Sequence, residues 1–143
     1  MGSIMLATSA GGDARVLHIA ALRRAKASGS NLTVVHVIGG ADYHAQPDQL
    51  REAIRSETHW LIHTMLGIAA DRSGVEPVGV TIHILEGDVA EELIEFATST
   101  RPDVVLVGAP RVSDHSEFST ESFSNLIAQL NQADLATEQI ETA

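Results

Sequence analysis

Ser113, Asp114 and His115 are the three side-chain types of a hydrolytic triad, and they stand next to one another in the sequence. A triad needs a nucleophile, a base and an orienting group that converge on one reacting atom, and consecutive residues cannot arrange their side chains in that way. No Gly-x-Ser-x-Gly nucleophile elbow occurs in the chain. We therefore predict no hydrolytic site here, and no enzyme of this type.

His59 and His63 are four residues apart, a spacing that can place two imidazoles on one helix face for a metal ion. On the opposite side of the same predicted helix lies an apolar stripe that consists of Leu50, Ile54, Leu61, Met65 and Ile68. We expect the stripe to be buried and both histidines to face solvent. Because no third ligand is evident, the sequence favours solvated histidines over a metal pair, and we predict no metal site.

Three further side chains have a structural interpretation. His36 and His83 fall inside predicted strands, where a hydrogen-bonded sheet histidine is more common than a ligand or a base. Trp60 lies at the edge of the apolar stripe, and we expect it to pack at the boundary of the core.

Phosphate-binding motifs and cysteine chemistry are absent from the sequence. No helix opens on Gly-x-x-x-x-Gly-Lys-Ser or Gly-x-Gly-x-x-Gly. The pairs Gly11-Gly12 and Gly39-Gly40 are weak signals, because loops also use glycine for turns. With zero cysteines, the chain has no disulfide, thiolate zinc site or cysteine nucleophile.

The charge balance limits the kinds of partner. Nine basic and nineteen acidic residues give a formal net charge of −10, which disfavours nucleic acid and anionic lipid, since both need a field of Lys and Arg. No apolar run approaches the length of a membrane span. We expect a soluble, cytoplasmic protein that is not inserted in a membrane.

Strand and helix patterns alternate along the chain. Apolar, β-branched runs predict strands at residues 4–7, 32–38, 78–85 and 103–107. Between them, helical spacing predicts helices from about residue 14 to 28, over 47–71, from the capping box at 88–91 onward, and around 123–130. This order predicts an α/β fold with a doubly wound parallel sheet in a three-layer α/β/α sandwich, where ligands dock at the carboxyl ends of the strands.

Four stretches give the chain a specific resemblance. Residues 4–9, 32–37, 86–94 and 102–108 each look like signature stretches of the universal stress protein family, and together they span residues 4 to about 130. The resemblance implies a domain over residues 1–130 with strand order 3-2-1-4. It also implies a homodimer or another protein partner, with association with a transporter as one form.

Many family members bind ATP, and their pattern can be checked position by position. The first strand usually ends in Ala-Thr-Asp, but here Ser9 replaces the Asp. After the fourth strand the family has Gly-x-x-Gly, nine residues, then Gly-Ser or Gly-Thr; this chain has Arg111 and Glu121 where the second and third glycines belong. If a nucleotide binds, the resemblance points to the following residues: Thr8, Ser9, His36, Val37, Gly108, Arg111 and Ser122.

These replacements oppose a bound polyanion. Glycine lets the backbone approach a phosphate and adopt positive φ, and a side chain obstructs both. Glu121 at about 6 Å from a phosphate charge would cost roughly 2–3 kcal/mol at an effective dielectric constant near 20. Asp114 and Glu117 add to this, and Arg111 is the only cation between residues 108 and 122.

The sequence thus leaves two functions open. The first is a non-catalytic regulatory or interaction module of the universal stress type that has no cofactor and has lost ATP binding. The alternative is a stress-response sensor that binds ATP or AMP in an altered cleft, with Arg111 holding a phosphate.

The end of the chain departs from the family as well. Family members usually close with an apolar edge strand, whereas residues 131–143 include Asp134, Glu138 and Glu141 and have no β-branched run. We expect an acidic tail that continues as helix or is disordered, rather than a fifth strand.

Overall fold

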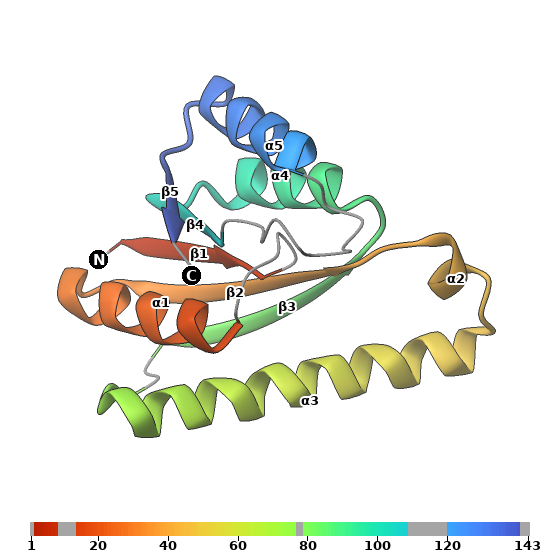
Figure 1. Ribbon diagram of the computed structural model, residues 1–143, viewed down its shortest axis with the longest axis horizontal. Helices are drawn as coiled ribbons and strands as arrows, with labels where there is room; N and C mark the ends of the chain where they lie inside the picture. The colour runs from red at the N-terminus through yellow and green to blue at the C-terminus, as the bar shows by residue number, and fades with distance from the viewer. Residues whose placement is uncertain (1, 9–13, 77–78, 109–119, 141–143) are drawn as a thin grey trace.

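A five-stranded parallel sheet with two layers of helices forms the protein (Figure 1). The computed structural model describes residues 2–8, 14–76, 79–108 and 120–140. The strands are β1 (Ser3–Ala7), β2 (Asn31–Ile38), β3 (Val80–Glu86), β4 (Val104–Gly108) and β5 (Thr137–Ile140), in the spatial order β3-β2-β1-β4-β5. The predicted α/β fold class and the strand order 3-2-1-4 are confirmed.

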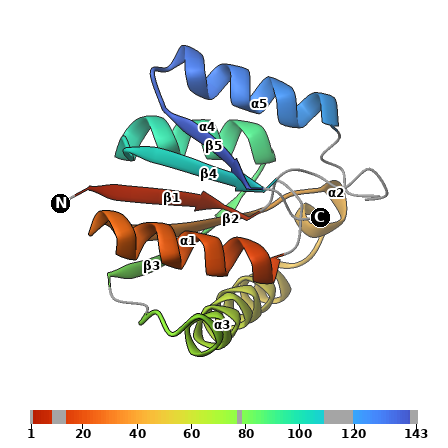
Figure 2. The same cartoon turned by 60° about the vertical axis from the view of Figure 1, so that its left-hand side comes forward.

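The helices lie on both faces of the sheet (Figure 2). Helices α1 (Ala14–Ser28) and α3 (Asp48–Ser73) pack on one face, and α4 (Val89–Thr100) and α5 (Thr120–Gln132) pack on the other. The short α2 (Ala41–His44) lies between β2 and α3. No helix in the described ranges is both long enough and apolar enough to cross a membrane.

Successive side chains along each strand point to opposite faces of the sheet, so the core consists of two clusters. Ile4 and Leu6 of β1 face α1 and α3, whereas Met5 and Ala7 face α4 and α5. Because both faces are covered, the strands read as continuous apolar runs. The predicted cap of α4 is confirmed: Asp88 accepts a hydrogen bond of 3.0 Å from the backbone N–H of Glu91.

The prediction of a helical or disordered tail is wrong for residues 137–140, which form β5. This strand pairs in parallel with β4, with Val105 opposite Thr137 and Gly108 opposite Ile140. Ile140 packs against the core under α1, and Arg24 of α1 makes a 2.7 Å ion pair with Glu138. An edge strand needs ladder hydrogen bonds but little apolar surface, so its sequence carries no β-branched run.

The predicted orientation of α3 is also wrong. Its buried residues are Ile62, Leu66 and Ala69, while members of the stripe expected in the core are about half exposed: Leu50 at 46%, Leu61 at 53% and Ile68 at 48%. Trp60 does not pack at the core boundary and is 65% exposed. The helix has apolar residues on two adjacent faces, and packing selects the face with Leu66.

Candidate functional site

Three of the predicted site residues lie side by side at the carboxyl edge of the sheet. Ala7 is in register with Val35 of β2 and Val107 of β4. The next residues of these three strands, Thr8, His36 and Gly108, therefore form one row across the end of the sheet. Ligands of doubly wound sheets bind at this edge, so the structure brings these three residues to the expected place.

Thr8 and His36 are hydrogen-bonded to each other. The Thr8 hydroxyl lies 3.0 Å from His36 Nδ1 and 3.2 Å from the carbonyl oxygen of Val35. A hydroxyl has a single proton to donate, and both contacts are within the protein. Burial lowers the pKa of His36 below its usual value, which favours the neutral imidazole.

Val37 and Ser122, two other predicted residues, are not part of this row. The side chain of Val37 is buried in the core under α4, on the opposite face of the sheet from Thr8 and His36. Ser122 lies in the first turn of α5. Ser9 and Arg111 lie outside the described residues, as do residues 113–115.

Two glycines allow the connections after β2 and β3 to lie close together at the same edge of the sheet. A Cβ atom on Gly39 would lie 2.9 Å from the carbonyl oxygen of Gly87, a distance at which the backbone must shift. Gly87 itself has a φ of +138°, which L side chains rarely adopt. The connections after β2 and β3 thus approach each other because glycine occupies both positions.

A polar network that the sequence did not predict anchors α2 beside this edge. The hydroxyl of Tyr43 donates a hydrogen bond to Glu86 at the end of β3, and Arg55 of α3 lies 3.7 Å from the same carboxylate. Burial and this hydrogen bond raise the pKa of Tyr43. The three residues are too far apart in sequence for any spacing to have indicated the contact.

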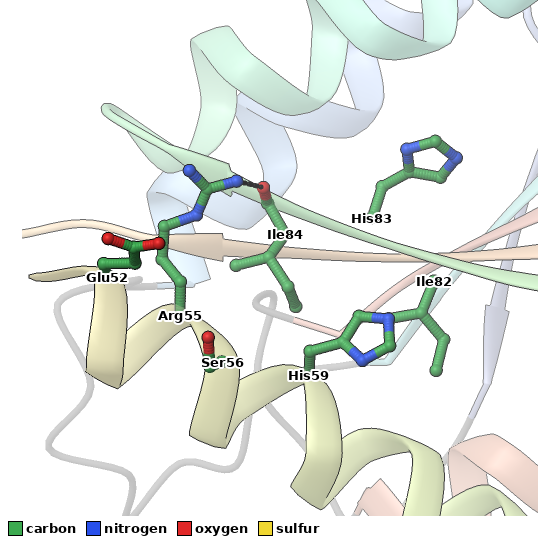
Figure 3. Close-up of a pocket in the computed structure, with 7 residues that line it drawn as sticks. All are labelled: Glu52, Arg55, Ser56, His59, Ile82, His83 and Ile84. Atoms are coloured by element: carbon green, nitrogen blue, oxygen red, sulfur yellow. Dashed lines mark hydrogen bonds between the residues drawn. The ribbon is translucent and has the colours of Figure 1, made fainter.

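A groove of about 530 Å³ lies between α3 and the edge strand β3 (Figure 3). Arg55 donates a 3.3 Å hydrogen bond to the carbonyl oxygen of Ile84, and His59 lies beside Ile82. His83 points to the far side of β3, where its ring lies 5.0 Å from that of Phe96. No three metal-binding side chains gather within the described parts of the chain, and His59 and His83 do not face each other.

His18 is a buried histidine that the sequence analysis missed. It lies on the sheet-facing side of α1 and is only 1% exposed, and neither of its ring nitrogens has a hydrogen-bond partner among the residues that the structure describes. Desolvation by burial lowers its pKa below 6.5. The helical spacing with Ala21, Leu22 and Ala25, which continues the buried face, was the signal that could have found it.

The buried His18 predicts how stability depends on pH. Folding keeps the ring neutral, whereas the unfolded chain binds a proton below the usual pKa of 6.5. The free energy of unfolding is therefore expected to fall as the pH drops below about 6.5. Urea unfolding followed by circular dichroism between about pH 7.5 and pH 5.5 measures the slope, to which His36, shifted in the same direction, also contributes.

Two variants test whether His18 causes this dependence of stability on pH. His18→Leu removes the buried imidazole, so we expect a shallower decline than in the original protein. His63→Gln removes an exposed imidazole of α3 and is expected to leave the decline unchanged. An equal slope in His18→Leu and the original protein would contradict the assignment.

Comparison with known proteins identifies a matching family and similar solved structures. The model of the universal stress protein family matches residues 1–134, and no curated protein sequence matches. The chain is similar to a universal stress protein in complex with cAMP, with 15% identity, 99% and 98% of the two chains covered and a TM-score of 0.68. A universal stress protein from Archaeoglobus fulgidus gives 18% identity, 98% of each chain covered and a TM-score of 0.66.

A third solved structure covers the full chain. A universal stress protein family protein from Arabidopsis thaliana with AMP bound has 15% identity, covers 100% of this chain and 93% of its own, and gives a TM-score of 0.58. At these identities the structures establish a shared fold. Because the family pattern extends over residues 1–134, the chain belongs to the universal stress protein family.

Proposed function

We propose that the protein is a non-catalytic regulatory or interaction module of the universal stress protein family that has lost ATP binding. The observation that carries this proposal is the loss of glycine at positions 111 and 121, where the family pattern has bare backbone around a phosphate chain. Glu121 adds a negative charge at that position. A polyanion there would meet both side-chain bulk and repulsion.

The Thr8–His36 contact supports the same proposal. A phosphate oxygen accepts hydrogen bonds and therefore needs donors from the protein. The single proton of the Thr8 hydroxyl is engaged with Val35 or His36. Thr8 therefore has no donor left for a phosphate unless this contact breaks.

An altered nucleotide cleft is the second candidate. Thr8, His36 and Gly108 form a row at the carboxyl edge of the sheet, and similar structures carry cAMP and AMP. In this form of the proposal Arg111 provides the positive charge for a phosphate group, and the ligand is an adenine nucleotide such as AMP or ATP.

Isothermal titration calorimetry distinguishes the two candidates. We expect no binding heat when ATP or AMP is titrated to about millimolar concentration, because glycine is absent from two phosphate positions. Micromolar binding of either nucleotide would overturn the proposed function. If a nucleotide instead raises the melting temperature and Arg111→Ala abolishes the rise, the altered cleft is the correct function.

A further inference from the structure

Helix α3 has an exposed apolar surface with a regular sequence pattern. Ile54, Leu61 and Ile68 are spaced by seven residues, as the core positions of a helix pair are. Leu61 and Ile68 are about half exposed. At 100° per residue, the side chains of Ile54, Leu61 and Ile68 point in a direction about the helix axis that is roughly 110° from the direction of the buried side chains of α3. The surface therefore lies beside the buried face of α3 rather than within it.

The charges at the two ends of this surface are opposite. Glu57 and Arg72 flank Leu61 and Ile68 and point within about 60° of the same direction. Both are exposed, and neither makes an ion pair among the residues that the structure describes. They are fifteen residues apart, or about 22 Å along the helix.

We infer that this surface of α3 binds the same surface of a second copy, with the two helices antiparallel. A two-fold axis between Thr64 and Met65 places Leu61 of each copy opposite Ile68 of the other. The same axis places Glu57 opposite Arg72 at both ends of the contact. Apolar residues thus meet in the middle, and opposite charges meet at each end.

The overall charge favours α3 as the contact between two copies. The chain has a formal net charge of −10, so two copies repel each other over most of their surface. Helix α3 has four acidic and three basic residues and is close to neutral. Two copies that meet along α3 therefore repel each other less than two copies that meet along α4, which has three acidic residues and no basic one.

The size and place of the surface set its expected strength. Helix α3 is 26 residues long. The surface area that one pair of such helices buries is smaller than the roughly 1,200–2,000 Å² that a stable complex buries. We expect a dimer that forms at micromolar concentration. Helix α3 packs against β3, at the opposite edge of the sheet from β5, so this contact leaves the β5 edge open.

Cysteine cross-linking tests the contact, because the native chain has no cysteine. Thr64→Cys places one thiol of each copy beside the two-fold axis. Ser99→Cys on α4 is the matched control: both hydroxyls bond to the carbonyl four residues earlier, at 2.9 Å for Thr64 and 3.0 Å for Ser99. Under mild oxidation we expect Thr64→Cys to cross-link at least about tenfold faster than the control.

Charge reversal tests the antiparallel arrangement. In the Thr64→Cys protein, Glu57→Arg or Arg72→Glu alone is expected to slow cross-linking several-fold, and the two together are expected to restore it. Equal rates for Thr64→Cys and Ser99→Cys, or no rescue by the double reversal, would overturn the inference. In a parallel pair the two Glu57 residues would face each other, so Glu57→Arg alone would not slow the reaction.

Discussion

Leu66→Ala is expected to lower the free energy of unfolding by about 2–5 kcal/mol, and Leu61→Ala by less than about 0.5 kcal/mol. Both substitutions remove the same side chain from the same helix. Leu66 is 3% exposed and Leu61 is 53% exposed. The first variant leaves a cavity in the core, whereas the second removes atoms that water already contacts.

Urea unfolding followed by circular dichroism measures this difference. Fluorescence of the single tryptophan is less suitable, because Trp60 is already 65% exposed in the fold. A loss of 2–5 kcal/mol corresponds to a decrease of roughly 6–15 °C in melting temperature. A larger loss for Leu61→Ala than for Leu66→Ala would show that α3 buries the other face. The measurement is made at low protein concentration, where the proposed α3 dimer would be dissociated.

The double substitution Arg111→Gly and Glu121→Gly is expected to create nucleotide binding. Removing the charge of Glu121 from the vicinity of a phosphate relieves roughly 2–3 kcal/mol of repulsion, but Arg111→Gly removes a cation at the same time, so the expected gain in affinity comes mainly from the backbone. Glycine at both positions also gives the backbone the freedom that the family pattern uses. Calorimetry with ATP is expected to show heat for the double variant and none for the original protein.

Single variants separate charge from backbone freedom. Glu121→Gln removes the charge without adding a glycine, so we expect it to give only part of the gain. Residue 121 lies in the first turn of α5, where glycine costs about 1 kcal/mol of helix stability, so each variant is first checked for folding by its melting temperature. If the double variant binds no more tightly than the original protein, the loss of glycine is not what prevents binding.

Much of the fold could be predicted from the sequence, because its patterns are local. The buried strands have apolar residues facing both helix layers, and Asp88 is an N-cap whose acceptor lies three residues before the N–H that it binds. Alternation of these elements implies a parallel sheet with crossover helices. Thr8, His36 and Gly108 were named by the resemblance to the universal stress protein family, and they lie in one row because strand ends share one edge in such a sheet.

The failed predictions concern elements whose local pattern is ambiguous. Residues 137–140 carry little apolar surface, and β5 forms because β4 offers an open ladder and α1 offers Arg24 and the core around Ile140. Helix α3 has two apolar faces of similar strength. Neither the formation of β5 nor the buried face of α3 can be predicted from residues close in sequence, because the contacts that determine them come from distant parts of the chain.

The sequence by itself determined the fold class and the absence of glycine from two phosphate positions, because periodicity and residue type express these directly, while the order of the central strands came from the resemblance to the universal stress protein family. Only the tertiary structure decided which face of α3 is buried, that Thr8 and His36 are hydrogen-bonded to each other, and that the buried His18 has no hydrogen-bond partner within the described part of the chain. Each of these depends on where one element lies against another, and packing between elements optimises total burial rather than the pattern of any single helix.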